Sequence, residues 1–211
     1  MNYEQRNAEN DESIKALDGV TKAGQDLGLW TATERKSYDG VRSAWQDVRD
    51  ADGRLFTLAA GGWNHEGQIT ATVANVTSDG ITVRPSEVVP YRDTVVSAAA
   101  SRKRAPEVIA KDLARRVIKD PTAIEQADKV AEHLAQRLKQ RAKLHVVRDR
   151  VVSLGYTVKE LARDESYKGS AWGRGDLPSV SFTFDGAVTL DYAPRVDLDR
   201  LPALLAILKR D

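Results

Sequence analysis

Cysteine is absent from this chain, and aromatic residues are scarce. The 211 residues include four Trp, six Tyr and three Phe. The absence of cysteine excludes disulfide scaffolds, zinc–thiolate sites and cysteine nucleophiles, and we expect a cytoplasmic protein because a reducing compartment suits such a chain. The shortage of aromatic residues indicates a core built mainly from Val, Leu, Ile and Ala.

Long apolar runs and a surplus of one charge are also missing. No stretch of about 18 apolar residues occurs, so we expect no membrane span. The N-terminus lacks the apolar segment of a secretion signal. The formal net charge is +1, with 41% hydrophobic and 30% charged residues, which is the ordinary balance of a soluble protein.

The first half of the sequence predicts helices followed by a small sheet. Apolar spacing predicts a helix that ends near Leu27-Gly28 and a second helix over 31–50, opened by a capping box of Thr31 and Glu34. From residue 54 the apolar period changes to two, which is typical of strands. The expected strands are 55–58, 68–76, 81–83 and 88–91. Their size and spacing suit a strongly bent antiparallel sheet, such as a small SH3-like β-barrel.

The second half predicts a linker, helices and a hairpin. Residues 96–105 are small and then basic, which favours a linker. Pro106 can open a helix, and Asp120-Pro121 can begin a long helix that reaches Leu154-Gly155. The apolar stripe of that helix changes side near residue 143. The helix therefore either breaks there or lies between two partners, one of which could be a second copy of the chain in a homodimer.

Beyond Gly155, a capping box of Thr157 and Glu160 predicts a short helix, and the glycine-rich residues 166–178 predict a loop. Residues 180–192 predict a β-hairpin in which Phe182 pairs with Leu190, because an odd loop of residues 185–187, or a bulge, keeps the apolar residues on one face. A helix is expected over 199–209. The fold class is α+β: N-terminal helices, a small antiparallel sheet, a long basic helical segment, and a C-terminal β-hairpin plus helix. The expected domains are residues 1–97 and 98–211.

Positive charge is concentrated in one part of the chain. Residues 102–150 hold 14 basic and 7 acidic side chains, whereas residues 1–101 hold 10 and 15. A basic block in a mildly acidic chain favours contact with the phosphates of DNA or RNA. The candidate phosphate-binding residues are Arg102, Lys103, Arg104, Arg115, Arg116, Arg137, Lys139, Arg141, Lys143, Arg148 and Arg150. The alternative for these side chains is a solvated helix surface or pairing with acidic residues.

No catalytic or metal-binding motif occurs, so the sequence predicts no catalytic residue, no metal site and no cofactor. An enzymatic activity is not indicated. The predicted function is a non-enzymatic nucleic-acid-associated protein. The alternative is a protein-binding accessory or inhibitor protein that uses Trp63 and Trp172, because a Trp within a glycine-rich loop can anchor a partner.

Overall fold

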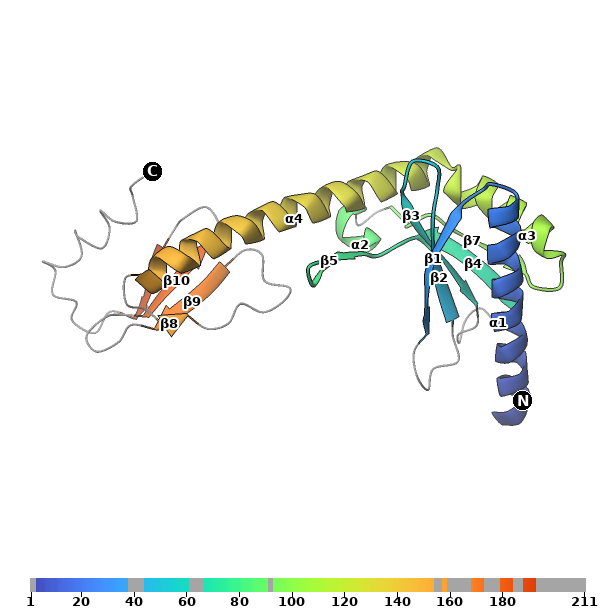
Figure 1. The fold of residues 1–211 in the computed structure, drawn as a ribbon, viewed down its shortest axis with the longest axis horizontal. Helices are drawn as coiled ribbons and strands as arrows, with labels where there is room; N and C mark the ends of the chain where they lie inside the picture. The colour runs from blue at the N-terminus through green and yellow to red at the C-terminus, as the bar shows by residue number, and fades with distance from the viewer. Residues whose placement is uncertain are drawn as a thin grey trace, which may run out of the picture. The chain divides into compact units, whose positions relative to one another are not determined.

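The computed structural model describes residues 3–37, 44–60, 67–90, 93–153, 157–158, 168–172, 179–183 and 188–192 (Figure 1). Helices and antiparallel sheets occupy separate stretches of the chain, which confirms the α+β class. The chain divides into two compact units: residues 1–76 with 83–132, and residues 77–82 with 133–211. The predicted boundary after residue 97 falls inside a strand of the first unit.

The first unit contains a five-stranded antiparallel sheet in the order β1-β2-β3-β4-β7. The strands are β1 (Thr31–Ser37), β2 (Ala44–Arg49), β3 (Leu55–Ala60), β4 (Gln68–Val73) and β7 (Ser97–Ser101). This order confirms the expected antiparallel sheet and does not establish an SH3-like arrangement.

One face of this sheet forms the core of the first unit. Phe56, Leu58 and Ile69 are completely buried, and Ala71 shares this face through its pairing with Leu58. Helices α1 (Tyr3–Asp26) and α3 (Pro106–Leu113) pack on the sheet (Figure 1). Their own buried residues include Leu17, Val20, Ile109 and Leu113.

The expected first helix is confirmed, whereas the helix predicted over 31–50 is wrong. Gly28 takes a positive φ of 64° and ends α1, as glycine does at helix termini. Residues 31–37 and 44–49 instead form the hairpin strands β1 and β2. In β2, Ala44, Gln46 and Val48 are buried, so the period of two overrides a spacing that also fits a helix.

Two further predictions in this unit are wrong. The expected linker contains β7, whose Ala98 and Ala100 are buried against the sheet core. Small side chains can form a strand where the neighbouring helices approach closely. Val88 ends the short helix α2 (Pro85–Val88) rather than a strand, and Tyr91 lies outside the described residues.

The long helix α4 (Pro121–Ser153) is continuous through residue 143. Asp120 is its N-cap, because its Oδ1 accepts the N–H groups of Thr122 at 2.9 Å and Ala123 at 3.0 Å. From Ala123 to Leu144, steps of three and four residues link its buried apolar positions when two half-buried arginines are counted with them. These positions are Ala123, Ala127, Val130, Leu134, Arg137, Arg141 and Leu144, and the next buried residue is Val151, seven residues later. The apparent change of side therefore reflects two arginines within one face.

The second unit holds a hairpin tip and a four-stranded sheet. Strands β5 (Val76–Ser78) and β6 (Ile81–Val83) meet at Asp79-Gly80, where both residues have positive φ, confirming the predicted turn. The sheet order is β11-β10-β9-β8, with β8 (Thr157–Val158), β9 (Lys168–Trp172), β10 (Ser179–Thr183) and β11 (Val188–Tyr192).

At the C-terminal end the register and several elements differ from the predictions. Strands β10 and β11 pair antiparallel with apolar residues opposite one another, but Phe182 pairs with Val188 rather than Leu190, and Val180 pairs with Leu190. Residues 157 and 158 are a strand rather than the start of a helix, as suits two β-branched side chains. Residues 168–172 are a strand rather than loop. The helix expected over 199–209 lies outside the described residues.

No helix within the described ranges has the length and apolar character needed to cross a membrane.

Candidate nucleic-acid interface

Three arginines surround a single carboxylate in the first unit. Arg115 Nη2 lies 3.1 Å from Asp112 Oδ1, and Arg104 Nη1 lies 3.1 Å from Asp112 Oδ2. Arg116 Nη1 lies 3.6 Å from the same Oδ2. We call these four residues the Asp112 cluster. It holds three positive charges against one negative charge, so its sum is positive.

The elements around β7 position these side chains. Arg104 lies in the turn after β7, where its N–H donates to Ser101 O at 3.3 Å. Asp112 lies in the last turn of α3, and Arg115 and Arg116 follow at i+3 and i+4, so all three meet on one helix face. Arg116 Nη1 also donates to Ala99 O at 3.0 Å. The cluster is therefore fixed to β7, which is the last strand in the order of the sheet.

A widened helical turn follows α3 directly. Residues Ala114–Ile118 form the π-helical turn η1, in which Lys119 N–H reaches back to Ala114 O at 2.8 Å. Val117 and Ile118 remain buried through this turn, while Arg115 and Arg116 remain on its solvent side. Such turns recur at functional sites in proteins.

The cluster is accessible to solvent and stays charged. The side chains of Arg115, Arg104 and Arg116 are 77%, 44% and 42% exposed, whereas that of Asp112 is 17% exposed. The hydrogen bond from Arg115 lowers the pKa of Asp112, and Arg104 and Arg116 act in the same direction against partial burial. Asp112 therefore remains ionised and holds the arginines at neutral pH.

The surrounding segment is also basic. Residues 102–119 contain seven basic and two acidic side chains. The exposed residues Lys103, Lys111 and Lys119 belong to this segment. Each arginine carries five N–H donors, and the described contacts use one or two of them. The remaining donors suit an incoming phosphate, which guanidinium groups can bind in a bidentate manner.

Arg102 has a different role from its neighbours. Its Nη1 donates to Ser13 Oγ at 2.6 Å, and its Nη2 lies 3.1 Å from Glu12 Oε2. Its side chain is 14% exposed. Arg102 therefore connects the end of β7 to α1.

Two predicted phosphate-binding arginines on α4 contact the main chain instead. Arg137 Nη1 donates to Thr82 O at 3.1 Å, and Arg141 Nη1 donates to Asp79 O at 2.6 Å. Both carbonyls belong to the hairpin of β5 and β6, within the second unit. These arginines lie on the inward face of α4 and stabilise the hairpin.

The other predicted phosphate-binding residues of α4 lie in the second unit. Lys139 and Lys143 are exposed, and Arg150 is half-buried. Arg148 Nη2 and Nε both contact Asp149 Oδ1, at 2.6 Å and 2.9 Å. The structure thus brings together Arg104, Arg115 and Arg116 in the first unit, whereas the predicted α4 residues belong to the second unit.

The two tryptophans of the alternative hypothesis stay untested. Trp63 lies outside the described residues. Trp172 ends β9, opposite Thr157 of β8, so its backbone is in a strand rather than in the predicted loop. A protein-binding role for these residues therefore stays a prediction.

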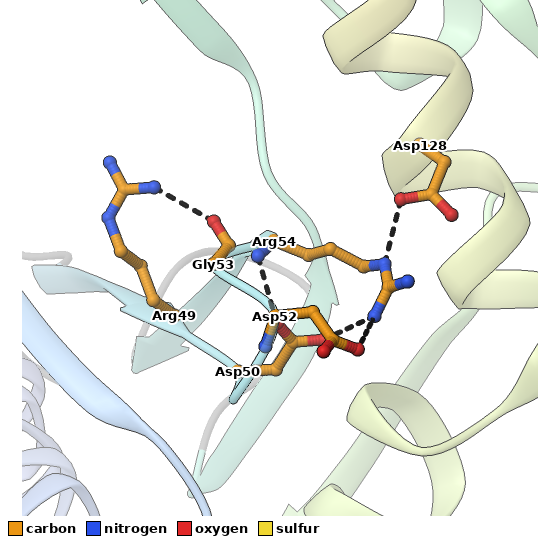
Figure 2. A network of polar contacts seen from close by, with 6 residues as sticks. All are labelled: Arg49, Asp50, Asp52, Gly53, Arg54 and Asp128. Carbon is orange, nitrogen blue, oxygen red and sulfur yellow. Dashed lines mark hydrogen bonds and ion pairs between the residues drawn. The ribbon is translucent and has the colours of Figure 1, made fainter.

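The first unit also contains an arginine among three carboxylates, the reverse of the Asp112 cluster. Arg54 contacts Asp128 at 2.7 Å, Asp50 at 3.2 Å and Asp52 (Figure 2). These hydrogen bonds raise the pKa of Arg54 above its usual value. The contacts join the β2–β3 turn to the start of α4, so the carboxylates are engaged in a structural role.

No family model, curated protein or solved structure matches this chain significantly. The function is therefore argued from the geometry alone. Among the described residues, no group of three or more His, Asp or Glu side chains could hold a metal ion.

Sequence reasoning selected the three arginines but missed Asp112, the residue that organises them. The signal was available locally, because positions 112, 115 and 116 have the i, i+3, i+4 spacing of neighbours on a helix. The contribution of Arg104 depends on β7 and the turn that follows it, whereas the sequence analysis assigned residues 96–105 to a linker.

Proposed function

We propose that this protein is a non-enzymatic nucleic-acid-associated protein that binds the phosphate backbone through Arg104, Arg115 and Arg116. The observation that carries the proposal is the convergence of three exposed guanidinium groups on one ionised carboxylate. A nucleic-acid backbone supplies closely spaced negative charges, and its release of counterions favours binding to such a cluster.

Asp112 makes the cluster a prepared site. Three mutually repelling guanidinium groups would otherwise separate, and the shared carboxylate holds them before a ligand arrives. Ordering these side chains in advance lowers the entropy lost on binding. An incoming phosphate then offsets the remaining positive charge. Its oxygens accept hydrogen bonds from the guanidinium N–H groups that the described contacts leave available.

Titration of the full chain into a labelled oligonucleotide, followed by fluorescence anisotropy, tests this function. We expect binding at about 50 mM salt that weakens strongly by about 200 mM, as for backbone contacts in general. The double variant Arg104→Gln/Arg115→Gln should weaken binding roughly tenfold at low salt. It should also reduce the slope of log K against log salt by about 2, because each lost phosphate contact contributes nearly one unit.

A matched control changes the same charge elsewhere in the first unit. Lys15 and Lys22 are exposed on α1, so Lys15→Gln/Lys22→Gln should keep the wild-type salt slope. The proposal is overturned if single-stranded and duplex oligonucleotides both fail to bind at low salt. It is also overturned if the arginine variant and the lysine variant bind equally well.

A further inference from the structure

The Asp112 cluster gathers its positive charge at one point. The nearest guanidinium nitrogens of Arg104 and Arg115 lie 3.1 Å from the Asp112 carboxylate, and that of Arg116 lies 3.6 Å from it. Continuous contact with a nucleic-acid backbone uses cations spread along a groove, whereas here three guanidinium groups surround one small anion. The geometry of the cluster therefore suits a single, strongly charged group.

The charge of the cluster matches a phosphomonoester better than a phosphodiester. Three arginines and the ionised Asp112 leave two positive charges uncompensated. A phosphomonoester carries a charge of about −1.5 to −2 at neutral pH, whereas each internal phosphodiester of a strand carries one negative charge. One phosphomonoester therefore neutralises the cluster almost completely, and one phosphodiester leaves about half of its charge uncompensated.

The hydrogen-bond donors of the cluster also suit a phosphomonoester. Each guanidinium group carries five N–H donors, and the described hydrogen bonds use one nitrogen of each arginine. Asp112 is the least exposed side chain of the four, so the guanidinium edges that do not contact it are accessible to solvent. A phosphomonoester presents three terminal oxygens, which is enough for each arginine to donate to a different one.

An exposed apolar residue lies beside the cluster on α3. Val108 is 45% exposed, although valine is among the residues most often buried in proteins. It precedes Asp112 by four positions, so the two side chains are neighbours on one face of the helix. Val108 can therefore contact the sugar or base that carries the bound phosphate.

Exposed lysines next to the cluster can contact the rest of a strand. Lys111 precedes Arg115 by four positions, and Lys103 directly precedes Arg104 in the turn after β7. A lysine attracts phosphate as a point charge, without the planar fork of an arginine. These lysines therefore suit the phosphates that follow the one bound by the arginines.

We infer that the Asp112 cluster binds the terminal phosphate of a nucleic-acid strand in preference to internal phosphodiesters. This inference rests on the proposed function and names the group that the site recognises. A terminal phosphate is the one phosphomonoester of a strand, so it alone combines the double charge and the three terminal oxygens. The neighbouring lysines add the sequence-independent attraction of the backbone.

The test compares strands that differ only at one end. An oligonucleotide of about eight nucleotides carries a 5′-hydroxyl, a 5′-phosphate or the methyl ester of a 5′-phosphate, with a fluorescent label at its other end. We expect the 5′-phosphate to increase the affinity of the full chain about tenfold at about 50 mM salt, because charge-assisted hydrogen bonds are strong. The methyl ester has the charge of an internal phosphodiester and should lose most of this gain. A second set with the modifications at the 3′ end shows which end is bound, and a gain at either end supports the inference.

Charge-conserving variants separate recognition of the terminal phosphate from general attraction. Arg104→Lys/Arg115→Lys keeps the charge of the cluster but removes two planar guanidinium forks. It should bind the 5′-hydroxyl strand with the wild-type salt slope and lose most of the preference for the 5′-phosphate. Lys15→Arg/Lys22→Arg on α1 is the matched control and should keep that preference. Both pairs exchange exposed side chains, and urea unfolding checks that each variant is folded.

The outcomes separate this inference from the proposed function. If hydroxyl and phosphate ends bind equally well and Arg104→Gln/Arg115→Gln weakens both, the terminal-phosphate inference is overturned and the backbone-binding function stands. If no strand binds in any form, the proposed function fails. A free mononucleotide that competes as well as the phosphorylated strand would overturn the assignment to a strand end. An undiminished preference for the phosphate end in Arg104→Lys/Arg115→Lys would overturn the assignment to this cluster.

Discussion

The indole of Trp30 lies directly over Gly24 of α1, so closely that a Cβ at position 24 would overlap its ring. The ring is 4% exposed, and its Nε1 donates to Thr21 O at 3.1 Å. Trp30, which directly precedes β1, thus packs against the C-terminal end of α1. Only glycine at position 24 leaves the necessary space for its ring.

Gly24→Ala should destabilise the protein even though alanine is the better helix former. Helix propensity alone predicts a gain of about 1 kcal/mol, but the overlap with Trp30 requires a shift that costs roughly 1–3 kcal/mol or more. Urea unfolding measures the difference. Gly19→Ala is the matched control, because its Cβ would lie 3.4 Å from Pro106 Cγ, and we expect it to be neutral or stabilising. A Gly24→Ala protein as stable as the wild type would contradict this packing.

Asp112 should contribute to stability in a pH-dependent manner. Its pKa is lower in the folded protein than the ordinary value of 3.8, so its contribution is complete above the unfolded pKa and is lost as the pH falls through the folded pKa. The difference in free energy of unfolding between the wild type and Asp112→Asn should therefore be constant above about pH 5 and shrink below about pH 4. Unfolding in urea across this range provides the measurement, and a difference that grows on acidification would refute the assignment.

Asp120→Ala should destabilise α4 at its first turn. The two N–H groups that donate hydrogen bonds to Asp120 Oδ1 would lose their acceptor. Loss of such a cap lowers the free energy of unfolding by about 1 kcal/mol. Asp120→Ser retains an acceptor and should preserve most of the stability. Thermal unfolding of both variants tests the cap, and equal losses in Ala and Ser would argue against it.

Gln126 should be required for the ordered start of β7. Its Oε1 accepts Val96 N–H at 2.9 Å, its Nε2 donates to Thr94 O at 3.1 Å, and the residue is 6% exposed. Gln126→Leu keeps the volume but leaves both main-chain groups unpaired, at a cost of about 1–3 kcal/mol. Amide exchange at Val96 should accelerate in this variant. Gln126→Glu retains the acceptor and should protect that amide better than leucine does.

Alternation and capping signals predicted much of the fold. Ile69, Ala71 and Val73 are buried as their spacing indicated, and Asp120-Pro121 begins α4. The helix predicted over 31–50 is wrong. Tyr38, Val41, Trp45 and Val48 satisfy helical spacing, although the sequence between them contains Asp39-Gly40, a dipeptide that favours hairpin turns. Pairing of β2 with β1 and β3 decides the conformation there, and a count of helical spacing does not take such pairing into account.

The candidate site was predictable only in composition. The charge of residues 102–119 selected the correct segment, and local spacing relates Asp112 to Arg115 and Arg116. The place of Arg104 beside Asp112 depends on how the turn after β7 meets α3, which no local pattern specifies. In the sequence, Arg137 and Arg141 resembled ligand-binding residues. Their acceptors are main-chain carbonyls, so no acidic residue in the sequence indicates that these arginines are already engaged.

The hairpin tip at residues 77–82 is synthesised before its arginine partners on α4. Arg141 follows Asp79 by 62 positions, so residues 83–132 of the first unit are synthesised before these hydrogen bonds can form. Fragments that end before Arg137 would leave the carbonyls of Thr82 and Asp79 without these donors. A fragment of residues 133–211 alone would lack this hairpin and would leave Arg137 and Arg141 without these carbonyl acceptors.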